Sequence, residues 1–159
     1  MVQIVLHVGA PKCGSSAIQT ALTGNPLIET DEGTTLAYGR INARGTLVYG
    51  VRIHPAKSAV GYRASANARR IAAFDHTQFS ALGRQLDAVE VDTLVLSSEG
   101  WLPQASLFER AFRIWEKPMR VIAYVRPQAN YLNAAWWQWG AWEDVGLEAW
   151  LTQRLPASF

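Results

Sequence analysis

The stretch VQIVLHVGAPKCGSS, residues 2–16, decides the fold that the sequence predicts. Its first seven residues form an apolar run rich in β-branched side chains, which is typical of a buried strand, and Gly9 closes that run. A short loop leads from Gly9 to Gly14. A helical composition follows, with Ser15 or Ser16 as the expected N-cap. The opening unit is therefore a strand, a glycine-rich turn and a helix.

Strands and helices alternate along the rest of the chain. Thr93–Ser97 and Met119–Val125 are predicted to be strands because both are continuous apolar runs of strand length. Helices are expected over residues 67–89 (in two pieces), from Pro103, from Pro127 to about residue 143, and over residues 147–155. This alternation predicts an α/β fold, in which a parallel sheet is covered by helices on both faces in three layers.

The segment of residues 25–65 is expected to form loops, with Thr46–Tyr49 as its one strand-like stretch. The three predicted strands end at Gly9, at residues 97–99 and at Arg126. In an open parallel sheet ligands bind beyond the carboxyl ends of the strands, so these three ends are expected to line one crevice.

Length, charge and composition indicate the broad class of protein. The 159 residues suit a single domain, and a formal net charge of +2 with scattered Lys and Arg does not indicate a nucleic-acid surface. The one cysteine, Cys13, excludes an internal disulfide and fits a reducing compartment. No apolar run approaches the length of a membrane span. A soluble cytoplasmic protein with no membrane partner is expected.

The loop of residues 9–16 has the features of an anion site. Where a glycine-rich turn leads into a helix, backbone N–H groups point at a bound phosphate. Ser15 and Ser16 add hydroxyl donors, and Lys12 adds a positive charge on a flexible stem. A plain strand-to-helix turn needs neither the lysine nor the two hydroxyls, so the combination favours phosphate binding.

This loop differs from that of the common nucleotide triphosphatases. Their pattern G-x-x-x-x-G-K-[ST] has a lysine directly after the second glycine, where this chain has Ser15. The next predicted strand ends in Ser-Ser-Glu rather than in an obvious magnesium-binding aspartate. Both departures point away from hydrolysis of ATP or GTP.

The sequence HVGAPKCGSS of residues 7–16 resembles the 5′-phosphosulfate loop of the sulfotransferase superfamily, commonly G-x-P-K-x-G-[ST]-[ST]. Residues 124–127, with the aromatic helix after them, resemble the family's 3′-phosphate segment, a strand that ends in arginine. Residues 96–99 resemble the strand end that precedes the acceptor site in many bacterial members. The resemblance covers residues 2–24 and 92–143, and implies a P-loop-type sulfotransferase core.

The resemblance implies 3′-phosphoadenosine 5′-phosphosulfate as the sulfuryl donor, with no metal. Its 5′-phosphate would be bound by one continuous loop segment, namely Pro11, Lys12, Cys13, Gly14, Ser15 and Ser16. Lys12 would also stabilise the bridging oxygen as its bond breaks. Arg126 would bind the 3′-phosphate. The family usually has a serine eight residues after this arginine. Here that position is Ala134, so Asn130 or Asn133 would have to supply the polar group.

An acceptor hydroxyl, on a small molecule or a carbohydrate, needs a base to take its proton. Glu99, just beyond a strand end, is the first candidate, and His54 on a loop is the alternative. His7 lies within the first strand and is interpreted as a structural histidine. Residues 136–142 hold four tryptophans, for which packing is expected and stacking on a sugar is the alternative. An apolar face left uncovered there would favour a homo-oligomer.

Two other functions remain open. One is a P-loop kinase or another enzyme that acts on nucleotide phosphates. The other is a non-catalytic nucleotide-binding or assembly module that kept the fold, which the loss of serine at Ala134 favours. Members of the resembling family usually continue beyond the second matching segment. The domain of residues 1–159 is therefore expected to be shortened at its C-terminal end.

Overall fold

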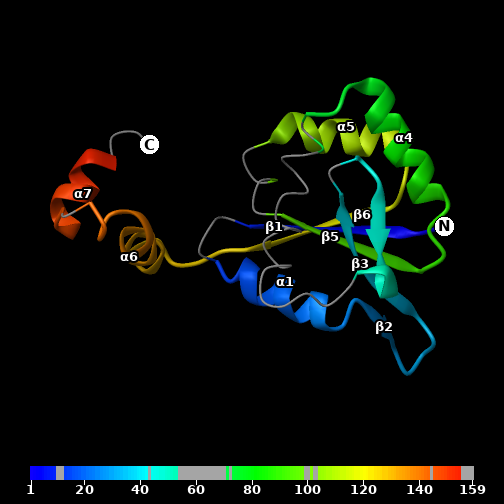
Figure 1. Cartoon of the computed structure of the whole chain (residues 1–159), viewed down its shortest axis with the longest axis horizontal. Coiled ribbons are helices and arrows are strands. Elements are labelled where there is room, and N and C mark those ends of the chain that lie inside the picture. The colour runs from blue at the N-terminus through cyan, green and yellow to red at the C-terminus, as the bar shows by residue number, and fades with distance from the viewer. Residues whose placement is uncertain are drawn as a thin grey trace. The chain divides into compact units, whose positions relative to one another are not determined.

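A computed structural model describes residues 1–9, 13–42, 44–53, 71, 73–98, 101, 104–143 and 145–154. By its internal contacts the chain divides into two compact units, Met1–Tyr124 and Val125–Phe159. Figure 1 traces the elements of both units.

The first unit contains a sheet and its covering helices. Its elements, in chain order, are β1 (Gln3–Gly9), α1 (Ser15–Gly24), β2 (Leu27–Glu29), β3 (Thr35–Ile41), β4 (Leu47–Tyr49), the 3₁₀ turn η1 (Gly50–Arg52), α4 (His76–Asp87), β5 (Thr93–Ser98), α5 (Ala105–Trp115) and β6 (Met119–Tyr124). The second unit contains α6 (Gln128–Trp139) and α7 (Leu147–Arg154).

The sheet has the strand order β2-β3-β5-β1-β6, and β4 pairs with β3 off this path. The strands β3, β5, β1 and β6 are parallel, whereas β2 and β4 run antiparallel to β3. The predicted α/β class is confirmed, but the wholly parallel sheet is wrong because the sheet is mixed. The reason is the short connections on either side of β3, since turns of this length join antiparallel strands and cannot make a parallel crossover.

The strand β3 corrects the expectation that residues 25–65 are mostly loops. It pairs with β5 inside the sheet, and Ala37, Tyr38 and Gly39 are buried. Glycine weakens a strand pattern because it adds no side chain to the sheet. A Cβ at Gly39, however, would lie 3.0 Å from both Leu94 Cδ1 and Leu96 Cδ2. The close packing against β5 therefore requires glycine at position 39. The same glycine makes β3 difficult to predict from the sequence.

Helices cover the two faces of the sheet, as Figure 1 shows for α4 and α5 on one side and α1 on the other. The larger core lies under α4 and α5, where alternate residues of β1 and β5 meet apolar side chains of both helices. The sequence predicts helices over residues 67–89 in two pieces, and α4 corresponds to the second piece. Phe79, Leu82 and Leu86 of α4 belong to this core, as does Val89 just after the helix. The smaller core joins Val5, Tyr38, Val95 and Ile53, with Leu22 of α1 packed against it.

The second unit is a helix pair in which α6 contacts α7. Ala135 and Trp150 are buried, and Trp136 donates its indole N–H to the carbonyl oxygen of Val145 at 3.1 Å. Among the described residues of the chain, no helix has the length and apolar character needed to cross a membrane.

Candidate functional site

The carboxyl ends of β5, β1 and β6 lie side by side at one edge of the sheet. The register pairs Val8 with Ser98 and Gly9 with Tyr124, so the last residues of the three strands are direct neighbours. These strand ends therefore meet at one edge, as expected, but β6 ends at Tyr124 rather than at Arg126, and the crevice expected between the ends stays a prediction. The edge is where an open parallel sheet presents its ligand-binding positions.

Gly14 makes the turn into α1. Its φ of 88° lies in the left-handed region, which a residue without Cβ adopts at little cost. Gly14 is itself the N-cap, and its carbonyl oxygen accepts from the N–H groups of Ala17 and Ile18 at 3.1 and 3.2 Å. The expectation of a serine N-cap is therefore wrong. Ser15 and Ser16 instead form the start of the helix, where the macrodipole favours an anion.

The two hydroxyl groups of this first turn face different surroundings. Ser15 is buried, with 3% of its surface exposed, whereas Ser16 is exposed and Cys13 is half-buried. Ser16 is therefore the hydroxyl that a ligand from solvent meets first. Ser15 is turned toward the protein.

A buried polar cluster lies behind this turn. The Ser97 hydroxyl oxygen is 2.7 Å from His7 Nδ1 and accepts a hydrogen bond of 3.0 Å from the side-chain amide of Gln19. The Tyr124 ring meets the His7 ring edge-on, with centroids 5.4 Å apart. The interpretation of His7 as a structural histidine agrees with its burial. The sequence reasoning missed Gln19, although its spacing of four from Ser15 was a usable signal.

Four of the predicted site residues lie outside the described part of the chain. They are Pro11, Lys12, His54 and Glu99. Their proposed roles, in phosphate binding and in taking the acceptor proton, remain predictions from the sequence.

The predicted 3′-phosphate residues belong to the second unit. Arg126 lies just before α6 and is exposed, as are Asn130 and Asn133 within that helix. The two asparagines are three residues apart, so they share one helix face. Either could supply the polar group that Ala134 lacks.

The tryptophan cluster is less buried than expected. Trp137 and Trp142 are 61% and 84% exposed, and Trp139 is also exposed. Trp139 and Trp142 line a hollow of about 540 Å³ together with Gln138 and Glu143. The expected packing role therefore holds for the half-buried Trp136 but is wrong for Trp139 and Trp142.

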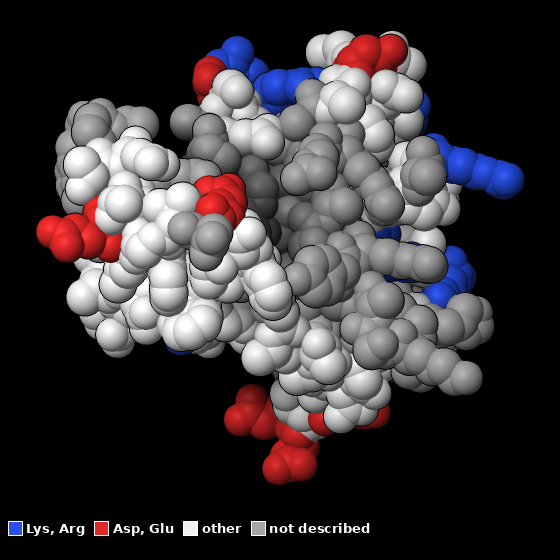
Figure 2. Space-filling model, turned by 60° about the vertical axis from the view of Figure 1, so that its left-hand side comes forward, with Lys and Arg blue, Asp and Glu red and all other residues white. Residues whose placement is uncertain are grey.

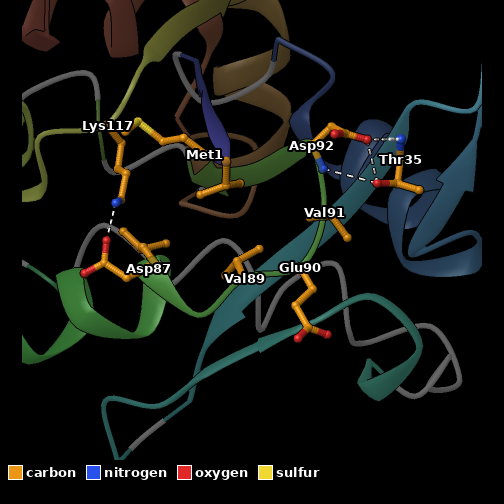
Figure 3. Close-up of a pocket in the computed structure, with 10 residues that line it drawn as sticks. Met1, Thr35, Asp87, Val89, Glu90, Val91, Asp92 and Lys117 are labelled. Atoms are coloured by element: carbon orange, nitrogen blue, oxygen red, sulfur yellow. Dashed lines mark hydrogen bonds and ion pairs between the residues drawn. The ribbon is translucent and has the colours of Figure 1, made fainter.

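A second hollow, of about 430 Å³, lies at the amino ends of the strands and is distant in the sheet from the carboxyl edge. Figure 3 shows three of its charged side chains, Asp87, Asp92 and Lys117, turned toward partners. Lys117 forms an ion pair with Asp87, and the Asp92 carboxylate accepts from both the N–H and the hydroxyl of Thr35. These side chains link neighbouring elements, so their contacts stabilise the fold.

Charged side chains are dispersed on the face that Figure 2 displays. The described Lys and Arg side chains lie in small groups, and those of Asp and Glu lie in others. Across the described ranges, no group of three or more His, Cys, Asp or Glu side chains is arranged to hold a metal ion. Comparison of the chain with protein-family models, with curated proteins and with solved structures found no match.

Proposed function

We propose that the protein binds 3′-phosphoadenosine 5′-phosphosulfate and transfers its sulfuryl group to an acceptor hydroxyl. The observation that supports this most is the turn at Gly14. It leads from the carboxyl ends of the parallel strands into a helix that begins with two serines, within a sequence that resembles a phosphosulfate loop. The resemblance and the local geometry both favour an anion at this turn.

In this proposal the loop and the first turn of α1 bind the 5′-phosphate. The backbone N–H groups of residues 12–16 and the exposed Ser16 hydroxyl supply hydrogen bonds, and Lys12 supplies charge. Arg126 binds the 3′-phosphate, and one of the exposed asparagines of α6 replaces the missing serine. Two anion sites then distinguish a 3′,5′-bisphosphate from a monophosphate.

Transfer requires the acceptor oxygen, the sulfur and the bridging oxygen to lie in line. The bond from sulfur to the bridging oxygen breaks while the bond from sulfur to the acceptor oxygen forms, and the 5′-phosphate leaves with the bridging electrons. Lys12 stabilises the charge that develops on this leaving group. Glu99, with His54 as the alternative, takes the proton of the acceptor hydroxyl. A small molecule or a carbohydrate with a hydroxyl group would serve as acceptor.

Nucleotide binding tests the proposal. We expect adenosine 3′,5′-bisphosphate, the product nucleotide, to raise the unfolding temperature more than AMP or ATP–Mg²⁺ at equal concentration, since ligand binding stabilises the folded state by mass action. In Arg126→Ala the bisphosphate should lose this advantage over AMP. The matched control is Arg113→Ala, which removes an exposed arginine from α5.

Three results would contradict the proposal. A larger shift with ATP–Mg²⁺ than with the bisphosphate would favour a kinase-like enzyme. Equal shifts with the bisphosphate and AMP, unchanged in Arg126→Ala, would remove Arg126 from the binding site. If the bisphosphate binds but [³⁵S]-labelled donor transfers nothing to a panel of phenols and sugars, a non-catalytic binding module is the better description.

A further inference from the structure

The buried residues of α1 are all polar. Ser15, Gln19 and Thr23 recur every fourth residue and are 3%, 1% and 5% exposed. A helix that covers a sheet normally presents an apolar stripe to it. Burying an amide or a hydroxyl costs free energy unless a hydrogen bond compensates. The buried polar groups of this stripe therefore need hydrogen-bond partners.

One hydroxyl group joins this helix to two strands. The side-chain amide of Gln19 donates to Ser97 Oγ at 3.0 Å, and His7 Nδ1 lies 2.7 Å from the same oxygen. His7 and Ser97 are direct register partners in β1 and β5. All three side chains are buried. Ser97 of β5 is thus connected to His7 of β1 and Gln19 of α1, which lie 90 and 78 residues earlier in the sequence.

The place of these hydrogen bonds in the fold is more important here than their energy. His7 lies two residues before the end of β1, Ser97 lies one residue before the end of β5, and Gln19 lies one helical turn beyond Ser15. The three residues therefore lie directly behind the turn at Gly14. Apolar contacts are non-directional, whereas hydrogen bonds fix a direction and a distance. The Gln19–Ser97–His7 chain can therefore fix the first turn of α1 against the strand ends.

We propose that Gln19, Ser97 and His7 are positioning residues that hold the first turn of α1 for binding of a nucleotide phosphate; this inference rests on the proposed function. Backbone N–H groups bind an anion well only when they are held close to the productive geometry, within about 0.5 Å. None of the three side chains needs to touch the ligand. Their effect reaches it through the backbone of residues 14–16.

Thr23 offers a matched control on the same helix. It is buried like Gln19, but its hydroxyl donates to the carbonyl oxygen of Gln19 at 2.6 Å, within α1 itself. Removing this hydroxyl deletes a buried hydrogen bond that does not tie the helix to the sheet. Thr23→Val therefore reports the effect of lost stability alone.

The test is the Kd for adenosine 3′,5′-bisphosphate, measured by calorimetry on the full chain, beside the free energy of unfolding in urea. Ser97→Ala and Gln19→Met should each weaken binding about fivefold to tenfold, the equivalent of one hydrogen bond. The double variant should weaken it no further than a single one, because the two residues share one interaction. Ser97→Thr, which keeps the hydroxyl, should restore the wild-type Kd. Thr23→Val should leave it unchanged.

The outcomes separate this inference from the proposed function. If wild type binds the bisphosphate, and Ser97→Ala and Gln19→Met lose stability but keep the wild-type Kd, the three residues are purely structural and the positioning role is refuted. If the wild-type protein gives no binding heat with the bisphosphate, the proposed function and this inference are both refuted. Gln19→Met keeps the length of the side chain, so it decides the question where Ser97→Ala does not fold.

Discussion

At the scale of single residues, Asp92 and Thr35 form a reciprocal pair at the amino ends of β5 and β3. The Asp92 carboxylate accepts from the Thr35 N–H at 2.8 Å and from the Thr35 hydroxyl at 2.9 Å, and the Asp92 N–H donates to the same hydroxyl at 3.1 Å. The backbone hydrogen bond from Thr35, followed by the hydroxyl, lowers the pKa of Asp92 below its ordinary value. Both groups are partners of the charged carboxylate, so they stabilise it.

This lowered pKa predicts how stability depends on pH. A carboxyl group with a lower pKa in the folded than in the unfolded state contributes stability above its unfolded pKa. That contribution is lost as the pH falls through the folded pKa. Asp92→Asn should therefore be less stable than wild type at neutral pH, and the difference should vanish in acid. Urea unfolding at a series of pH values measures it. Asp31→Asn removes an equal charge from an exposed turn and serves as control. A difference that does not change with pH would contradict the prediction.

At the scale of elements, the central question is how β3 enters the sheet. It pairs in parallel with β5 and carries two antiparallel neighbours, β2 and β4, on its connections. The face of β3 at Gly39 lies tightly against Leu94 and Leu96 of β5. A side chain at this position would have to displace one of the two leucines, and both are fully buried.

Substitution of Gly39 should therefore disturb the sheet rather than stabilise the strand. Gly39→Val introduces a residue with high strand propensity but overfills the contact with β5. We expect a loss of about 1–3 kcal/mol, the usual cost of overpacking a core. Gly24→Ala, where a Cβ meets no atom within 4 Å, should change stability by less than about 1 kcal/mol. Unfolding in urea measures both variants. A Gly39→Val protein as stable as wild type would show that β5 can yield at this contact.

At the scale of the whole molecule, the chain has two compact units, and the second depends on a close helix contact at Gly140. This residue follows α6, and its N–H donates to the Trp136 carbonyl oxygen at 2.7 Å. A Cβ at Gly140 would lie 2.5 Å from Trp136 Cδ1 and 2.7 Å from Trp150 Cδ1. Real Cβ atoms essentially never approach other atoms so closely, so the two indole rings leave room only for glycine.

Gly140→Ala should loosen the second unit. One of the two rings must move, which should cost about 1–3 kcal/mol of its local stability and speed hydrogen exchange at the amides of α6 and α7. Gly146→Ala is the matched control because a Cβ there meets no atom within 4 Å. Hydrogen exchange followed by mass spectrometry resolves the peptides of both helices. Equal exchange in the two variants would show that the packing around Gly140 is not what holds the helices together.

The elements that could be predicted from sequence are those whose signal is local. The run before Gly9 and the runs over residues 93–97 and 119–125 predicted strands because each is short and mostly apolar. In the structure β1 and β5 are buried, whereas β6 is exposed along most of its length. The helix that packs Phe79, Leu82 and Leu86 was equally readable from its period. The turn at Gly14 was predictable as a strand-to-helix turn, and the meeting of three strand ends followed from the parallel arrangement.

Features that arise from contacts between distant residues became visible only in the folded chain. β3 was not predicted because glycine has low strand propensity. Gly39 is required there because Leu94 and Leu96 of β5 leave too little room for a side chain. Gly14 rather than a serine caps α1, since a left-handed φ is a property of the turn and not of the helix that follows. The hydrogen bond from Gln19 to Ser97 spans 78 residues of sequence, and the contact of Ser97 with His7 spans 90. A sequence pattern records which residues are polar and how they are spaced, whereas the partner of each buried polar group is chosen when the sheet and its helices come together.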